Sequence, residues 1–155
     1  MEKELSCGIL NFYKENNDIY VLLASAGGPY FKNKEIWSIP KGLMEKDEKE
    51  IDTAYREFIE ETGIDIYKDN IKYLNKISQS NKKDVVCFYT EGKFDLSGFK
   101  SNYFTMEWPP KSGKIQEFPE TKEIKYIEIN KAKNIIIKGQ IKLLEKLEEI
   151  LGENK

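Results

Sequence analysis

Three acidic residues of this chain recur at a spacing that could support chemistry. Glu57, Glu60 and Glu61 stand at positions i, i+3 and i+4, which project from one face of an α-helix. Like charges at this spacing repel each other, and a bound cation offsets that repulsion. Oxygen-only ligands favour a hard ion, so we expect Mg²⁺ or Mn²⁺. Taken alone, three glutamates on one helix face are more typical of a solvated surface than of a metal site.

The composition excludes most other catalytic chemistry. The chain has no histidine, which rules out a Ser-His-Asp triad, a Cys-His pair and a His-ligated zinc ion. Cys7 and Cys87 are far apart in the sequence, so a structural zinc or a disulfide framework is not expected. Arg56 is the single arginine among 25 basic residues. An arginine retained against a lysine-rich background indicates a site that needs a planar, bidentate donor.

A helix beginning near Asp47 is expected to position these residues. We predict that Asp47 is its N-cap, with Glu50 completing a capping box, and that Gly63 ends it. The apolar residues at helical spacing, which should form the buried stripe, are Ile51, Ala54, Tyr55, Phe58 and Thr62.

The rest of the chain reads mainly as strands. The segments with β-type patterning are Leu5–Phe12, Asp18–Ala24, Ile71–Gln79, Asp84–Glu91 and Ile124–Ile129. We predict turns at Tyr13–Asn17 and Ser80–Lys83, and a loop beginning at Lys41-Gly42. Asp95–Gly113 is expected to be irregular, with Trp108-Pro109-Pro110 extended.

Two helices are expected near the C-terminus. Asn130 is a candidate cap for a short helix, and Gln140–Leu151 has the pattern of an amphipathic helix stopped by Gly152. Strands combined with helices in this order predict an α/β or α+β fold, a mixed sheet covered by helices. The length of 155 residues predicts one domain spanning residues 1–155.

The net charge and the length of the apolar runs exclude further classes of function. The net charge is −2, whereas proteins that bind nucleic acid generally carry a basic excess, so no nucleic-acid partner is expected. No apolar run approaches the roughly 20 residues that span a bilayer. The N-terminus lacks a basic region followed by an apolar stretch. We therefore expect no membrane association and a cytoplasmic location.

The segment from Gly42 to Ile64 carries a joint pattern. Gly42 is followed after five residues by Glu48, and after seven more by the run REFIEETGI, residues 56–64. This arrangement resembles the Nudix box without a departure. The segments SAGGPYF, WSIPKG, SNYFTMEWPPKSG and QEFPE resemble a Nudix subgroup described as nucleoside triphosphate pyrophosphohydrolases. The resemblance implies an α/β/α sandwich with a mixed sheet between helices, and hydrolysis of a nucleoside diphosphate linked to another moiety.

The resemblance also implies roles for individual residues. Glu60 and Glu61 would be the principal metal ligands, with Glu57 either a third ligand or the base that activates water. The carbonyl of Lys41 would complete the metal shell. Arg56 would orient the glutamates through a bidentate bond linked to Glu48, for which a simple first-turn acid is the alternative.

A further carboxylate is expected from a loop before a late strand. Glu120 stands six residues before Tyr126 and is the first candidate, followed by Glu117 and Glu107. An exposed loop glutamate without a role is the alternative.

Candidate substrate contacts are basic and aromatic residues near this segment. Lys41 and Lys34 could contact phosphates as point charges. The rings considered for stacking on a base are Tyr30, Phe31, Trp37, Phe104 and Trp108. We hypothesise that Tyr103–Pro110 forms a wall or lid of the substrate cleft.

Three functions remain open at this stage. The first is a nucleoside triphosphate pyrophosphohydrolase. The second is a dinucleoside polyphosphate hydrolase, because the tripeptide Pro40-Lys41-Gly42 is also common in that group. The third is a catalytically silent Nudix module that senses a nucleotide. Such modules usually lose box glutamates, whereas this chain keeps all of them.

Overall fold

A mixed β-sheet forms the centre of the protein. The computed structural model describes residues 3–29 and 35–152. Its sheet has the order β3-β2-β1-β6-β5, with β4 added beside β1 and β9 beside β2. β1 and β6 pair in parallel and the other pairs are antiparallel. The bounds of the strands are β1 Glu4–Glu15, β2 Asp18–Ala26, β3 Trp37–Ser38, β4 Lys41–Leu43, β5 Lys72–Ser80, β6 Lys83–Glu91 and β9 Thr121–Glu128.

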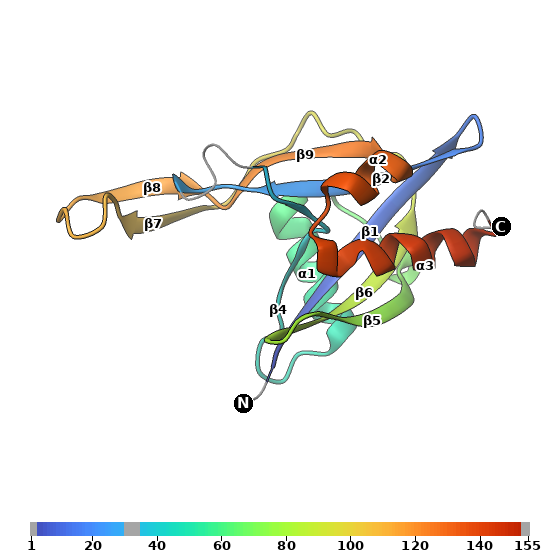
Figure 1. Cartoon of the computed structure of the whole chain (residues 1–155), viewed down its shortest axis with the longest axis horizontal. Coiled ribbons are helices and arrows are strands. Elements are labelled where there is room, and N and C mark those ends of the chain that lie inside the picture. Colours follow the sequence, from blue (N-terminus) through green and yellow to red (C-terminus); the bar gives the residue numbers. More distant parts are fainter. Residues whose placement is uncertain (1–2, 30–34, 153–155) are drawn as a thin grey trace.

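Helices cover both faces of this sheet, with α1 behind it and α2 and α3 in front in Figure 1. Buried side chains therefore form two cores, one between the sheet and α1 and one between the sheet and α2 and α3. Leu22 packs in the first core and its neighbours Val21 and Leu23 pack in the second. Because both faces are covered, β2 is apolar almost throughout. The helical segments are α1 Glu50–Thr62, η2 Lys68–Asn70, α2 Ile129–Ile135, η3 Lys138–Gln140 and α3 Ile141–Leu151.

This arrangement confirms the expected fold class, an α/β/α sandwich around a mixed sheet. In the described ranges, no helix combines the length and the apolar composition needed to cross a bilayer.

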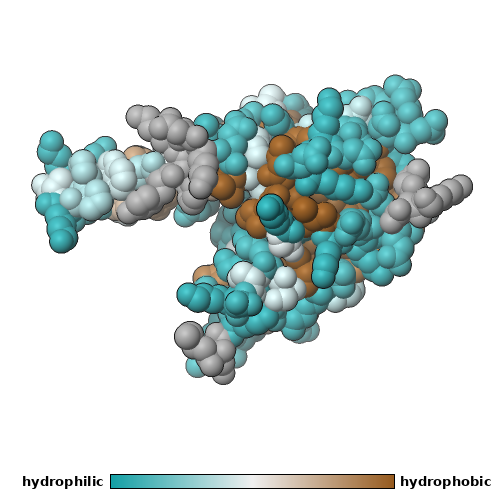
Figure 2. Space-filling model, viewed as in Figure 1, coloured by the Kyte–Doolittle hydropathy of each residue, from teal (hydrophilic) through white to brown (hydrophobic). Residues whose placement is uncertain are grey.

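A separate two-stranded hairpin projects from the sheet. It consists of β7 (Tyr103–Glu107) and β8 (Ile115–Pro119), which pair with each other in antiparallel register. Figure 1 shows this hairpin extending away from the body, and Figure 2 shows it as an arm that is mostly pale or teal. In that view the most hydrophobic residues gather on the body instead. The arm is thus held by its root, where β8 runs directly into β9.

The hairpin corrects one expectation. Asp95–Gly113 was expected to be irregular, but it contains β7, and Trp108-Pro109-Pro110 lies in the turn of the hairpin rather than in an extended segment. A five-residue strand that pairs only with its neighbour has a weak sequence signal among Pro, Ser and Gly residues.

Other local expectations differ from the structure in extent. The first turn involves only Asn16 and Asn17, both with positive φ, so β1 and β2 continue past the predicted limits. Lys41-Gly42 does not begin a loop but forms β4, which is stabilised by pairing with β1. The cap of α2 is Glu128, whose carboxylate accepts from the backbone N–H groups of Asn130 and Lys131, and not Asn130.

A buried glutamine ties the connection between β3 and β4 to the helical layer. Gln140 is fully buried, and its Oε1 accepts a 3.0 Å hydrogen bond from the backbone N–H of Ile39. Its Nε2 donates to Gln79 Oε1 at 2.9 Å. Ile39 is two residues before Lys41, so this amide fixes the backbone that leads into β4.

Replacing Gln140 by leucine should therefore destabilise the protein. The Gln140→Leu variant leaves the buried N–H of Ile39 without its acceptor, and the free energy of unfolding should fall by about 1–3 kcal/mol. Urea denaturation measures this change. Glu145→Gln, at an exposed site on α3, the helix that follows Gln140, is the control and should stay within about 0.5 kcal/mol of the parent. Equal urea midpoints for Gln140→Leu and the parent would contradict the assigned role.

Candidate active site

The helix that carries the glutamates, α1, packs against β4. It ends as predicted at Gly63, whose φ of 72° places it in the left-handed region and whose N–H donates to Ile59 O at 2.8 Å. Its start differs from the prediction. The N-cap is Lys49, without a side-chain bond, and Asp47 has a φ of 68° in the preceding turn. The capping box is absent, and the acid that organises this turn is Glu48.

Glu48 and Arg56 form a two-pronged ion pair. Arg56 Nε donates to Glu48 Oε2 and Nη2 donates to Oε1, both at 2.9 Å. Glu48 Oε1 also accepts from Thr53 Oγ1 and from the backbone N–H of Glu45. These bonds, the one from Arg56 first, lower the pKa of Glu48 to about 2 and raise the pKa of Arg56 above its ordinary value. A lysine could not supply this planar fork.

The same guanidinium reaches the glutamate row. Arg56 Nη1 donates to Glu57 Oε1 at 2.9 Å and lies 3.5 Å from Glu60 Oε2. Glu57 is the more enclosed of the two, with 16% of its side chain exposed against 44% for Glu60. Arg56 therefore links Glu48 to the glutamates, which is the geometry that the resemblance implies for it.

The carboxylate of Glu57 lies directly over Gly42. A Cβ on Gly42 would stand 2.0 Å from Glu57 Cδ, where no atom fits. Gly42 was expected to be a turn glycine, but it lies within β4, opposite Cys7 of β1. What this position requires is the close approach of a carboxylate to the backbone, and not a special backbone conformation.

Glu61 is held against the same strand. Its Oε2 accepts a 2.8 Å hydrogen bond from the backbone N–H of Lys41. Burial first, and then the charges of Glu57 and Glu120, raise the pKa of Glu61 to about 8 against the opposing effects of that bond and of the Lys41 charge. Burial, and next the charge of Glu60, also raises the pKa of Glu57. The carboxylates thus share a partly enclosed place in which the positive charges of Arg56 and Lys41 do not fully offset burial and mutual repulsion.

Lys41 contributes a side chain as well as a backbone to this place. Burial, and next the charge of Lys83, lowers the pKa of the Lys41 amine, while Glu61 and Glu57 oppose the change. The ammonium group of Lys41 therefore lies within electrostatic reach of both carboxylates.

Of the three candidates for an extra carboxylate, Glu120 is the one whose charge acts on the glutamate row. Its side chain is exposed and its charge raises the pKa of both Glu57 and Glu61. Its backbone is fixed by bonds to Asn102 and Gly27. Glu107 instead accepts from two backbone N–H groups in the hairpin turn, and Glu117 lies on β8.

The donor set suits a hard divalent cation. Within residues 3–29 and 35–152, no three Asp, Glu or Cys side chains converge on one point as they stand, and Arg56 occupies oxygens of Glu57 and Glu60. All available donors are nevertheless oxygens, and the mutual repulsion of Glu57, Glu61 and Glu120 is what a cation would relieve. Glu57 and Glu61, with Glu60 beside them, are the residues that would hold it.

The predicted aromatic and basic contacts fall into three groups. Tyr30, Phe31 and Lys34 lie outside the described residues. Trp37 is 1% exposed and belongs to the core, so it cannot stack on a substrate. Trp108, in the hairpin turn, lines a cavity between the hairpin and the loop after β2. The sequence analysis did not identify Gln116 and Phe118, which line the same cavity. Their spacing of two residues, typical of one face of a strand, could have indicated that they lie on the same side.

The Glu48–Arg56 pair predicts a specific pH dependence of stability. Because folding lowers the pKa of Glu48 to about 2, its contribution is complete above the ordinary glutamate value near 4.3 and is lost as the pH falls toward about 2. The stability difference between the parent and Glu48→Gln should be constant from pH 7 to 5 and shrink below pH 4.5. Urea unfolding at several pH values measures it.

Glu45→Gln is the matched control for this experiment. Glu45 is 70% exposed and lies 3.7 Å from Arg56, so its replacement should change stability little at any pH. A stability difference for Glu48→Gln that stays constant down to pH 3 would show that the ion pair does not behave as described.

Comparison with known proteins places the chain in a family. The family model described as NUDIX domain matches residues 3–147. Nudix hydrolase 7 of Arabidopsis thaliana is 27% identical over 121 residues, which cover 74% of this chain and 40% of that protein. The RNA pyrophosphohydrolase of Pelagibacter ubique (strain HTCC1062) is 26% identical over 130 residues, 77% of this chain and 78% of that protein.

Solved structures share the fold. The NUDIX domain of Shewanella oneidensis NrtR, complexed with ADP ribose, has a TM-score of 0.66 at 16% identity over 97% of this chain and 90% of that chain. The Ap4A hydrolase of C. elegans has a TM-score of 0.61 at 22% identity over 96% and 98% of the two chains. The match across residues 3–147 confirms the resemblance seen in the Gly42–Ile64 segment. This chain belongs to the NUDIX family.

Proposed function

We propose that this protein hydrolyses a phosphoanhydride bond of a nucleoside triphosphate and releases pyrophosphate, with Mg²⁺ or Mn²⁺ as cofactor. The observation that carries the proposal is the contact between α1 and β4. There the carboxylates of Glu57 and Glu61 meet the backbone of Gly42 and Lys41, and the charge of Glu120 acts on both. The relatives named as a Nudix hydrolase and an RNA pyrophosphohydrolase support a pyrophosphohydrolase activity.

Each residue then has a task in the reaction. A bound divalent ion supplies charge neutralisation on the phosphate oxygens and lowers the pKa of a coordinated water. Glu57, Glu60, Glu61 and the carbonyl of Lys41 would hold it, with Glu120 as the further ligand. Arg56, anchored by Glu48, keeps Glu57 and Glu60 in position. The Lys41 side chain contributes positive charge for the phosphates.

The reaction needs no covalent contribution from the protein. The oxygen of a water attacks the α-phosphorus in line, the bond from that phosphorus to the α–β bridging oxygen breaks, and pyrophosphate departs with the bonding electrons. The proton of the water passes to a carboxylate, for which Glu57 is the candidate if it does not serve as a ligand. Carboxylates suffice for both roles, so the absence of histidine is no obstacle.

A dinucleoside polyphosphate is the second candidate substrate. The tripeptide Pro40-Lys41-Gly42, which forms the entry to β4, and the fold shared with an Ap4A hydrolase favour it. A nucleotide sensor is the candidate from a different class, since a Nudix domain of similar fold is complexed with ADP ribose in NrtR. The intact glutamate row favours an enzyme over a sensor.

Metal dependence tests the proposed activity. Turnover should require Mg²⁺ or Mn²⁺ and disappear with EDTA. Loss of a residue that merely supports a metal ligand costs 10–100-fold, so Glu61→Gln should lower kcat at least about 100-fold. Glu60→Gln should lower it as well. Glu149→Gln, at a 67% exposed site on α3, should keep the parental rate.

The substrates for this test are nucleoside triphosphates, diadenosine tetraphosphate and a 5′-triphosphorylated RNA oligonucleotide, with products separated by anion-exchange chromatography. Pyrophosphate released from mononucleotides supports the proposal. Cleavage of dinucleotides alone would transfer the assignment to the second candidate. Nucleotide binding without metal-dependent turnover would establish the sensor and refute the enzyme.

Gly42→Ala probes the close approach at the centre of the site. The added methyl group would stand 2.0 Å from Glu57 Cδ. The glutamate tip can swing aside, so the chain should fold with a near-parental melting temperature. The displaced carboxylate should nevertheless lower kcat by about 100-fold.

Gly98→Ala is the control for this substitution, because a Cβ there meets no atom within 4 Å. A Gly42→Ala enzyme with the parental kcat would show that the position of Glu57 does not limit the reaction.

A further inference from the structure

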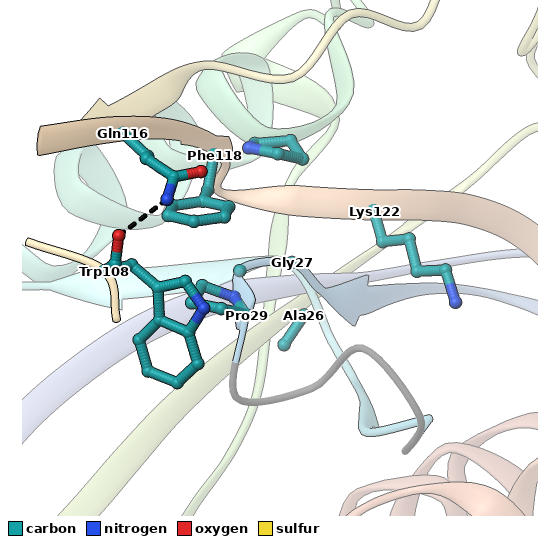
Figure 3. A pocket seen from close by; sticks show the side chains of 9 residues that line it. Ala26, Gly27, Pro29, Trp108, Gln116, Phe118 and Lys122 are labelled. Carbon is teal, nitrogen blue, oxygen red and sulfur yellow. Dashed lines mark hydrogen bonds between the residues drawn. The ribbon is translucent and has the colours of Figure 1, made fainter. Parts of the chain in front are cut away.

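A cavity of about 390 Å³ lies between the β7–β8 hairpin, the loop after β2 and the start of β9. Its lining includes Gly27 and Gly28 from the loop after β2, Trp108, Gln116 and Phe118 from the hairpin, and Lys122 from β9. Figure 3 shows Trp108, Gln116 and Phe118 converging toward Gly27 and Pro29. The volume lies within the range of about 300–1,000 Å³ that small-molecule sites occupy.

Close backbone packing fixes the shape of this cavity. A Cβ on Gly27 would stand 2.2 Å from Pro119 O, and a Cβ on Gly28, whose φ is +100°, would stand 3.1 Å from Phe104 Cζ. The Gly27 N–H also donates to Glu120 O at 3.0 Å. The two glycines therefore allow the loop and the hairpin root to meet as one surface, and the cavity is built into that junction.

The walls combine flat apolar groups with one oriented amide. Gln116 and Phe118 share the cavity side because alternate residues of β8 lie on one face, and Trp108 of the hairpin turn lines the same cavity. Gln116 Nε2 donates to Trp108 O at 2.6 Å, which fixes the carboxamide (Figure 3). Its Oε1 is thereby oriented as an acceptor for an N–H group. Aromatic walls with one directed polar group suit a planar heterocycle.

The cavity adjoins the acidic site through the chain itself. Pro119, which lines the cavity, immediately precedes Glu120, and the charge of Glu120 acts on Glu57 and Glu61. Lys122 lies two residues further along, on the cavity side. The cavity wall therefore carries one positive charge, from Lys122, and leads through Pro119 to Glu120, whose charge acts on the acidic cluster. This arrangement suits a ring joined to a polyphosphate.

We propose that this cavity binds the nucleobase of the substrate, with the ring against Trp108 and Phe118 and an edge N–H on Gln116. The inference rests on the proposed function, because it requires that the substrate be a nucleotide. In this proposal the hairpin and the loop after β2 bind the base. The residues at the α1–β4 contact bind only the phosphates.

Kinetics with and without a base separate these two parts. For a nucleoside triphosphate, Trp108→Ala should raise KM by about tenfold or more, since loss of one base–aromatic stack has that effect, and should leave kcat nearly unchanged. Trp108→Phe should restore most of the affinity. Inorganic triphosphate, which has no base, should show the same KM with all three proteins.

Ile115→Ala is the matched control. Ile115 adjoins Gln116 on β8, is 68% exposed and lies on the opposite face of the hairpin. Its replacement should leave KM for the nucleotide unchanged, which excludes a general effect of hairpin substitutions. Equal changes in KM for the nucleotide and for inorganic triphosphate, or no change with Trp108→Ala, would overturn the inference and leave the proposed hydrolysis intact.

A binding measurement without turnover covers the case in which no nucleotide is hydrolysed. The chain has two tryptophans, and Trp37 is 1% exposed, so a ring stacked in the cavity should quench the fluorescence of Trp108. Adenosine, which has no phosphate, should quench the metal-free parent saturably and Trp108→Phe not at all. Identical quenching of both proteins, or none in either, would refute the cavity as a base site whatever the activity assay shows.

Discussion

The structure of the site depends on one close contact, the packing of the α1 glutamates onto the bare backbone of β4. The Glu57 carboxylate occupies the space that any side chain at position 42 would need. The Glu61 carboxylate accepts a hydrogen bond from the backbone N–H of Lys41. Two carboxylates are thereby brought out of solvent and near each other, which raises the pKa of both. A helix alone would display its acids to water. Packing against the strand encloses these acids, and Arg56 and Lys41 offset only part of their burial and mutual repulsion.

Contacts on both sides hold the glutamates and β4 in place. Arg56 restrains the glutamates from one side and is itself restrained by both oxygens of Glu48. On the other side, β4 is placed by pairing with β1 and by the hydrogen bond from Ile39 to Gln140. The anchoring side chains come from the turn before α1 and from the far helical layer. The positions of the Glu57 and Glu61 carboxylates are therefore set by contacts that extend from one helical layer, through the sheet, to the other.

The sequence predicted those parts of the structure that are local. The end of α1 at Gly63, the glutamate row and most strands follow from periodicity and from cap residues. The predicted start of α1 was wrong. Glu48, rather than Asp47, organises the preceding turn, and it does so through an ion pair with Arg56, two turns further along the helix. β4 has three residues and exists only because β1 pairs with it. The partner of Ile39 lies 101 residues away, and no local pattern reveals such a bond.

The two buried cysteines can report on local unfolding of the two layers of the structure. Both thiols are fully buried, and burial raises the pKa of Cys7 to about 11 and that of Cys87 as well. Neither sulfur can react with an alkylating reagent until its strand is exposed. Cys7 lies on the central strand β1, where it faces Gly42 of β4 and is buried against the α1 side, whereas Cys87 lies on the neighbouring strand β6 and is buried on the side of α2 and α3. The labelling rate of the first thiol therefore reports opening of the layer between the sheet and α1, and that of the second reports opening of the layer between the sheet and α2 and α3.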